Sequence, residues 1–435
     1  MAVPALSWSG CESGGVIAGG RFVAPSISGS TWTPSRDDGG NIVAGNWIGL
    51  PINTTLYVGS QTLNDVVEMP HYIKYGGGDS ANGIISAWAG MAFDYVNQAG
   101  YICNGGHYDS SACETGIYKA DFNKLTFSRI KNRNPMGDVQ AWNESTSTID
   151  SAENFSGSGY GGVPLANGGF PGASHTYNGI VWVPPSLLGN TSGGIFFATL
   201  AKTIYDIDAG TWKTTNFFKP STRFFDYSNS AAFLDGSKFY GPYSQNYHWV
   251  FDTTQTDPTD YSATSYGKFT TGGITNGKTF YSGDNSIWGV LRERREEFSI
   301  AYGASVRIRY GQAIDASATN WASYADDITL TSSDGSHLDF SSAALNNSTF
   351  TQCGKAYDHA TGTLYLVPNV AGAAIYKITG LSGNTWTIEK IAGTSTLAAS
   401  VNHVYGRCVL IAAQGRKFLV QITSKDVPMQ ITRVV

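Results

Sequence analysis

The sequence predicts an all-β protein assembled from repeated units of short antiparallel strands. Charged residues make up 14% of the chain, against about 25% in an average protein, and 52 of the 435 residues are glycine. This composition is typical of many turns that join short strands. The longest helix-like charged run, residues 291–298 (LRERREEF), is too short and too isolated to carry a helical domain.

One cadence recurs along the chain: an apolar strand, a turn with Asp, Asn or Gly, a second strand, and a strand that ends near an aromatic residue. The first clear unit covers residues 90–107 and 116–130, and residues 285–324 carry a blurred version of it. The other clear units are residues 174–217, 230–254, 354–391 and 402–424. Self-similarity at this spacing predicts a repeat architecture. We count six units, and residues near the N-terminus could supply a seventh.

The first unit resembles the kelch repeat, in which a glycine pair ends one strand and large aromatics follow. The matching residues are Gly105, Gly106, Tyr118 and Phe127. In other units the glycine pair is missing or displaced, and the aromatic matches are Tyr205 with Trp212 and Tyr376 with Trp386. The resemblance implies an all-β, kelch-like β-propeller of six or seven blades over residues 84–435. Glycine permits close strand approach and aromatics fill the space between blades, so these residues are expected to be packing elements.

Two segments fall outside the repeat pattern. Residues 1–83 are predicted to form an N-terminal arm or small subdomain, in which residues 55–69 could supply a strand or two and residues 75–83 a linker. Residues 134–173 are predicted to be an inserted loop rich in Gly, Ser and Asn. Loops of this length are usually functional or disordered, and we expect this one to project and to touch a partner.

No motif in the sequence points to catalysis, so we expect neither an enzyme nor a cofactor. The galactose oxidase propeller, which shares the kelch repeat, binds copper through tyrosines and histidines, and that set cannot be matched here. The seven histidines, none at a metal-ligand spacing from another, are His71, His107, His175, His248, His337, His359 and His403. The adjacent carboxylates at 37–38, 296–297 and 326–327 point to opposite faces if they lie on strands.

The cysteines do not form a recognisable framework. Their number is odd and no CxxC pair occurs; they are Cys11, Cys103, Cys113, Cys353 and Cys408. We therefore expect free, buried thiols in a reducing compartment. A bridge between Cys103 and Cys113 across one hairpin stays open as the alternative.

Recognition by loops is the function that this pattern favours, because a propeller gathers a loop from every blade on one face. The candidate ligand- or partner-binding residues are His107, Asp109, His175, Tyr177, Arg223, Tyr405 and Arg407, together with Trp142, Tyr160 and Phe170 of the inserted loop. The net charge of −5 and the absence of a basic cluster argue against nucleic acid. No apolar run is long enough to cross a bilayer, and no signal peptide is seen.

The leading hypothesis is a non-enzymatic structural or receptor-binding component of a larger assembly. The Gly, Ser, Thr and Asn content and the low charge resemble phage tail, fibre or capsid-decoration proteins, which predicts a virion location, oligomers, and partners among other virion proteins or a host-surface glycan. The alternative is a carbohydrate-binding or carbohydrate-active propeller of lectin, oxidase or sialidase type. In that alternative Trp88, Trp142 and Trp182 would be stacking platforms for sugar rings.

Overall fold

The structure is a computed structural model that describes part of the chain. The described residues are 16–18, 21–23, 46–67, 83–86, 89–103, 116–132, 142–143, 148–149, 176, 179–197, 203–212, 233–235, 238–244, 247–252, 268–269, 286–291, 296–301, 307–310, 320–321, 329–336, 354–358, 360–380, 385–391, 404 and 406–435.

The first blade is a four-stranded antiparallel meander made from one continuous stretch of chain. Its strands, from the first to the last, are β4 (Ala92–Asp94), β5 (Ala99–Cys103), β6 (Ile117–Asp121) and β7 (Thr126–Lys131). Every residue of β5 is buried, which is the pattern of a strand covered on both faces. Tyr118 and Phe127, two of the residues that carry the kelch resemblance, are buried, so their predicted packing role is confirmed.

Two further blades repeat this order. One contains β10 (Ile180–Val183), β11 (Gly194–Phe197), β12 (Thr203–Asp206) and β13 (Thr211–Trp212), with the short helix α2 (Pro185–Leu188) between its first two strands. The other contains β23 (Gly354–Asp358), β24 (Thr363–Val367), β25 (Tyr376–Thr379) and β26 (Thr385–Lys390), with β22 (Thr329–Thr331) added in parallel to the outer edge of β26. Tyr205 and Trp212 face each other on β12 and β13, with ring centroids 5.3 Å apart.

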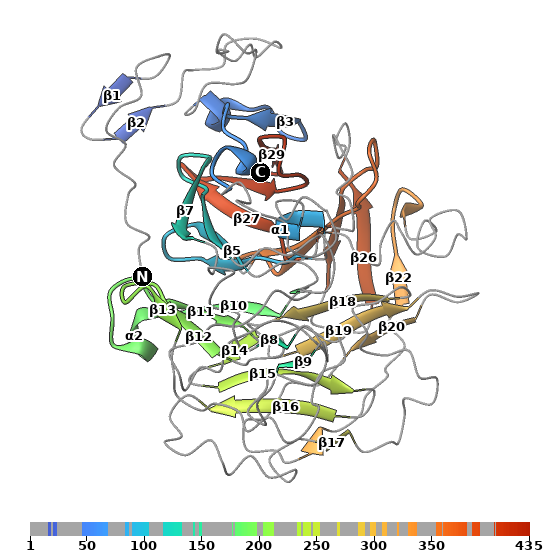
Figure 1. The fold of residues 1–435 in the computed structure, drawn as a ribbon. Helices are drawn as coiled ribbons and strands as arrows, with labels where there is room; N and C mark the ends of the chain where they lie inside the picture. Colours follow the sequence, from blue (N-terminus) through green and yellow to red (C-terminus); the bar gives the residue numbers. More distant parts are fainter. Residues whose placement is uncertain are drawn as a thin grey trace.

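The last blade joins the two ends of the described chain. Three strands are consecutive, β27 (Cys408–Ala413), β28 (Arg416–Gln421) and β29 (Met429–Arg433), and the fourth is β3 (Thr55–Val58), antiparallel to β29. Figure 1 shows the blue β3 beside the red β29. Residues 55–69, which the sequence pattern left open as a source of a strand or two, supply this strand. A segment predicted to belong to the N-terminal arm thus completes a blade.

The remaining described strands form shorter or less regular sheets. Between the second and third of these blades in the chain lie a five-stranded sheet, β14 (Phe233–Asp235), β15 (Lys238–Ser244), β16 (Tyr247–Asp252), β17 (Lys268–Phe269) and β21 (Asn320–Trp321), and a three-stranded sheet, β18 (Ser286–Leu291), β19 (Glu296–Ala301) and β20 (Arg307–Tyr310). Two-stranded sheets are formed by β1 (Val16–Ala18) with β2 (Arg21–Val23) and by β8 (Trp142–Asn143) with β9 (Thr148–Ile149). The short helices are η1 (Asn46–Gly49), η2 (Leu63–Asp65) and α1 (Gly83–Ser86).

The blades stand side by side with their first strands innermost. A Cβ added to Gly354 at the start of β23 would lie 2.5 Å from Cβ of Cys408 at the start of β27. At the seam between the last and first blades, the N–H of Ala412 in β27 donates to Gln98 beside β5. At the seam between the first blade and the blade of β10, the N–H of Gly90 before β4 donates to Thr176 before β10. Apolar clusters fill each seam. Four-stranded meanders packed face to face around their inner strands define a β-propeller, so the predicted all-β propeller is confirmed, with four blades identified.

Candidate functional site

The strand connections at the two ends of the blades form two different faces of the propeller. Because each blade is a meander and neighbouring inner strands start together, the first-to-second and third-to-fourth strand turns share one face, which we call the turn face. The second-to-third connections and the links between blades leave from the opposite face, which we call the loop face. On the turn face, Tyr95 at the end of β4 meets Trp182 near the end of β10, with ring centroids 5.1 Å apart.

The turn face is built from a recurring aspartate turn, first seen in the first blade. Oδ1 of Asp94 accepts the N–H groups of Val96 and Asn97, both at 3.0 Å, and Gln98 closes the turn with φ of 49°. In the other turn of this blade, Oδ1 of Asp121 accepts from the backbone of residues 123 and 124 at 3.0 and 3.1 Å. Aspartate satisfies the backbone of a tight turn in this way without any ligand.

The same turn occurs in two other blades. Oδ1 of Asp206 accepts from the N–H groups of Asp208 and Ala209, each at 3.1 Å. Oδ1 of Asp358 accepts from Ala360 at 3.1 Å. The fourth residue after each aspartate has a positive φ, and here it is Gly210 or Gly362. The sequence carried a signal for these turns, since in each of them an aspartate ends one strand and the next strand begins five residues later.

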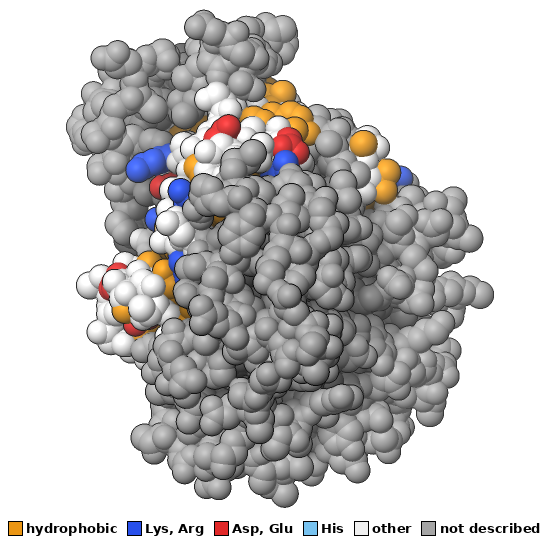
Figure 2. Space-filling view, viewed as in Figure 1, with side chains coloured by type: hydrophobic (Ala, Val, Ile, Leu, Met, Phe, Trp, Pro, Cys, Tyr) orange, Lys and Arg blue, Asp and Glu red, His pale blue; other side chains and the backbone are white. Residues whose placement is uncertain are grey.

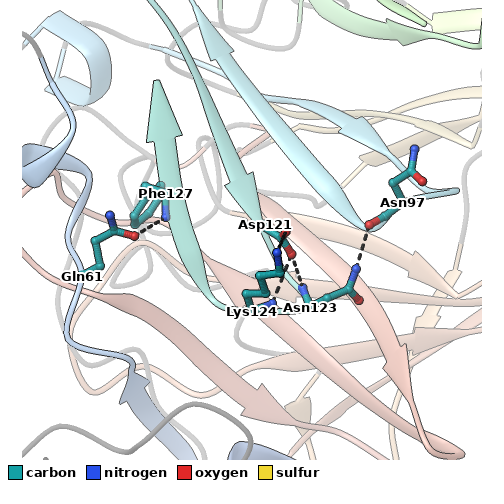
Figure 3. Close-up of polar contacts among 6 residues, drawn as sticks. All are labelled: Gln61, Asn97, Asp121, Asn123, Lys124 and Phe127. Carbon is teal, nitrogen blue, oxygen red and sulfur yellow. Dashed lines mark hydrogen bonds and ion pairs between the residues drawn. The ribbon is translucent and has the colours of Figure 1, made fainter. Parts of the chain in front are cut away.

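The turns of the first blade also lock to each other and to their neighbours (Figure 3). Nδ2 of Asn123 donates to the carbonyl of Asn97 at 2.9 Å, and Nε2 of Gln98 donates to Oδ1 of Asn123 at 3.2 Å. On the outer strand, the N–H of Phe127 donates to Oε1 of Gln61 at 2.6 Å. The amides of this network are therefore occupied by the protein itself.

An ion pair joins the turn face of two blades. Nζ of Lys417 in β28 contacts Oδ2 of Asp358 at the end of β23, and the hydroxyl of Thr361 donates to the same oxygen at 2.6 Å. Burial acts to raise the pKa of Asp358, but the hydrogen bonds from Lys417 and Thr361 outweigh it and the pKa is lowered. Burial, and then the charge of Asp358, raise the pKa of Tyr365 to about 12. At neutral pH Asp358 is thus an ionised carboxylate paired with the ammonium of Lys417.

A second carboxyl group with a lowered pKa, that of Asp208, lies on the exposed turn between β12 and β13. Oδ2 of Asp208 accepts from the N–H and hydroxyl of Thr191, each at 2.6 Å, and from the N–H of Ser192 at 3.2 Å. The hydrogen bonds from Ser192 and Thr191 lower the pKa of Asp208 to about 2. This carboxylate fixes the loop that follows α2, and it has no proton to donate at neutral pH.

The turn face also presents two exposed apolar side chains on one rigid turn. Tyr95 and Val96 are 64% and 62% exposed, while Trp182, against which Tyr95 packs, is 2% exposed. Trp182 therefore presents no ring face to a sugar, contrary to its role in the carbohydrate alternative. In the described surface visible in Figure 2, acidic, basic and small apolar areas alternate.

Arg407 is the one predicted binding residue whose side chain the structure describes. It is fully buried; Nε donates to the carbonyl of Ala89 at 2.8 Å, and Nη1 donates to the carbonyl of Ile422. Since Ala89 precedes the first blade and Ile422 lies in the last, the guanidinium ties these two blades together at the loop-face end of their inner strands. A role in binding a partner stays a prediction.

The side chains of the other predicted binding residues are outside the description. Trp142 belongs to β8, with its side chain outside the description. Outside the described residues altogether are His107, Asp109, Tyr160, Phe170, His175, Tyr177, Arg223 and Tyr405. The segment with His107 leaves from the end of β5 and returns at β6, and Arg223 lies between β13 and β14. The described strands that border these segments end in second-to-third or blade-to-blade connections, which leave from the loop face.

The described residues contain neither a metal-binding cluster nor a disulfide. Among them, no three His, Cys, Asp or Glu side chains are grouped so as to hold a metal ion. Cys103 and Cys408 are free and buried, as expected, and burial raises the pKa of Cys103 to about 12. Cys113, the other half of the alternative bridge, lies outside the described residues. Within the described part, no helix has the length and apolarity to cross a membrane.

The fold and these seams define the class of this protein as a β-propeller, and comparison with known proteins adds little to that. No family model matches the sequence, and no curated protein matches it either.

Similar solved structures are distant. The extracellular domain of a hybrid two-component system from B. thetaiotaomicron shares 8% identity at a TM-score of 0.35, over 80% of this chain and 33% of that one. PorZ of the Porphyromonas gingivalis type-IX secretion system shares 12% at 0.34, over 80% and 32%. A chain of a mitotic checkpoint complex shares 10% at 0.35, over 94% and 100%. The chain thus spans about a third of the length of the first two.

Proposed function

We propose that this chain is a non-enzymatic recognition propeller, a structural or receptor-binding component of a larger assembly that contacts its partner through the loop face. One observation supports this most. On the turn face, the aspartates of the described turns are held by backbone N–H groups, an ammonium or hydroxyls of the chain itself. The described strand ends that border the segments singled out for binding lie at the opposite face.

The finer description of the fold is part of the same proposal. We assign six or seven blades of kelch type. The two sheets between β13 and β22 stand, in chain order, where further blades are required, and the facing Tyr205 and Trp212 fit the aromatic pattern of the repeat. The assembly that we propose is a bacteriophage virion, for which the Gly-, Ser-, Thr- and Asn-rich, weakly charged composition is the motive.

Binding through the loop face is tested with matched variants of the two faces. The purified chain is applied to arrays of bacterial surface polysaccharides and to whole bacterial cells. A double substitution on the loop side, His175→Ala with Tyr177→Ala, is compared with Tyr95→Ser and Val96→Ser on the turn face. We expect the first pair to lower binding at least tenfold and the second pair to leave it within twofold. The reverse order would overturn the assignment of the face.

The assembly and the absence of catalysis have separate tests. Phage particles from a bacterium that carries the gene are purified on a density gradient and digested for mass spectrometry. Peptides of this chain in a fixed ratio to a capsid protein would support a virion component, and their absence would refute it. The same polysaccharides are incubated with the purified chain. Release of reducing ends, abolished by one carboxylate substitution, would establish the carbohydrate-active alternative.

A further inference from the structure

Residues 46–67, which we call the clasp, are held in the propeller by contacts with strands from the other end of the sequence. Six of its side chains are buried in the apolar cluster that fills the seam between the last and first blades: Trp47, Ile48, Leu50, Val58, Leu63 and Val67. Trp47 packs edge-on against Phe418 of β28, with ring centroids 4.7 Å apart. The clasp is therefore part of the core and more than an added edge strand.

Hydrogen bonds also join the clasp to strands from the other end of the sequence. The N–H of Asn53 donates to the carbonyl of Arg433 at 2.8 Å, and the N–H of Asn64 donates to the carbonyl of Lys425 at 2.8 Å. Nη1 of Arg433 donates to the carbonyl of Leu50 at 2.9 Å. The hydroxyls of Thr55 and Thr432, 377 positions apart in the sequence, are 2.8 Å apart.

The clasp meets its neighbours through residues that any other copy of this chain also presents. Its partners are β28, β29, the loop before β29 and the outer strand β7. The covalent connection from the clasp to the first blade is the stretch 68–82, and about 15 residues span at most about 50 Å. An exchange therefore requires the seat of the clasp in the adjoining copy to lie within this distance.

We propose that the clasp is exchanged between copies of this chain, so that Thr55–Val58 of one copy completes the last blade of the next. Exchange preserves every hydrogen bond and every buried side chain named above, so its equilibrium depends on concentration and not on new contacts. A short connection gives the clasp an effective concentration of about millimolar within its own chain. Copies packed side by side reach the same range. The inference rests on the proposed function in this one respect, that the assembly places many copies together.

Disulfide trapping between facing residues tests the exchange. Thr55→Cys and Thr432→Cys are made as two separate single variants, which face each other across β3 and β29 at a spacing suited to a disulfide. The two purified full-length variants are mixed at about millimolar concentration, where exchange competes with closure within one chain, and are then oxidised. Non-reducing electrophoresis measures the covalent dimer. The control is Thr55→Cys mixed with Lys124→Cys, whose lysine is 69% exposed and reports random collision.

We expect the facing pair to give at least tenfold more dimer than the control, and dilution by a hundredfold before mixing to abolish the difference. Equal yields in both mixtures would overturn the proposal. Should either variant fail to fold by circular dichroism, the pair Tyr57→Cys and Gln430→Cys, which face each other two positions further along the same strands, replaces both. Because purified chain alone is used, a negative result here leaves the virion proposal unaffected, and failure of the virion test leaves this result standing.

Discussion

The first and last blades are both four-stranded sheets, but their strands come from the sequence in different ways. The first blade is made from residues 92–131, and each of its strands pairs with the next one along the sequence. The last blade takes three strands from residues 408–433 and its fourth from residues 55–58. Local pairing costs little loop entropy, whereas pairing across almost the whole chain must be repaid by burial. The clasp supplies that burial through Trp47 and its neighbours, so the two blades should respond differently to substitutions.

The largest expected difference comes from removing the main anchor of the clasp. Trp47→Ala should lower the free energy of unfolding by about 3–5 kcal/mol, the usual cost of truncating a buried aromatic. It should also raise hydrogen exchange in β29 well above that in β5. Urea unfolding and exchange mass spectrometry measure the two effects. Tyr101→Ala, also buried but in the first blade and in the cluster at its other seam, is the matched comparison. Equal loosening of β29 and β5 by both variants would contradict a separate clasp.

Arg407 should rank next, because it joins the two blades under comparison. Arg407→Met keeps most of the apolar stem but leaves the carbonyls of Ala89 and Ile422 without this donor. Hydrogen bonds from charged groups contribute about 1.5–3 kcal/mol each, so a loss of about 3 kcal/mol is expected in urea unfolding. If Arg407 instead served mainly to bind a partner, the variant would unfold like the parent and lose binding.

The ion pair on the turn face should make the seam of the last blade sensitive to acid. The pKa of Asp358 is lowered by its partners in the folded state, so its contribution is present above the unfolded-state pKa of about 3.9 and is lost as the pH falls through the folded-state pKa. Asp358→Asn should cost about 2 kcal/mol at pH 7. That gap from the parent should shrink towards pH 2, as measured by urea unfolding at several pH values. A gap independent of pH would rule out this role of the carboxylate.

Two buried thiols report how often each blade opens. Cys103 lies in β5 and Cys408 in β27, and a buried thiol reacts only when its surroundings open. Because the fourth strand of the last blade is not local, Cys408 should be alkylated about tenfold faster than Cys103, equivalent to about 1.4 kcal/mol in opening free energy. Peptide mapping after timed labelling with iodoacetamide gives both rates. Faster labelling of Cys103 would reverse the comparison.

The smallest effect is expected from a single aspartate turn. Asp121→Ala removes the acceptor of two backbone N–H groups on an exposed turn, where water replaces it, so about 1 kcal/mol is expected. Asp94→Ala also removes the contact from Nδ2 of Asn97 at 2.8 Å and should cost slightly more. Thermal unfolding of both variants makes the comparison. Asp121→Asn, which keeps one acceptor oxygen, should recover part of the loss.

The local features of this fold could be predicted from the sequence, and the non-local ones could not. Alternating apolar residues and Asp-containing turns indicated the four strands between Ala92 and Lys131, and the packing roles of Tyr118 and Trp212 followed from their size. The pairing of Thr55–Val58 with β29 leaves no such trace, because a strand pattern does not name a partner 377 positions away. The structural contacts of Arg407 could not be predicted for a related reason. A charged residue in a turn-like sequence suggests solvent, and only the packed seam reveals the carbonyls that it satisfies.

The clasp places the closing seam of the ring inside a blade, out of phase with the sequence repeat. A tandem duplication or loss of one whole repeat anywhere between the first blade and β27 would therefore leave both halves of that seam intact. Such an event would alter the circumference of the ring without opening it. In the closed ring of six or seven blades that we propose, unequal recombination could therefore change the number of blades, provided that the two short stretches that meet at the seam are inherited together.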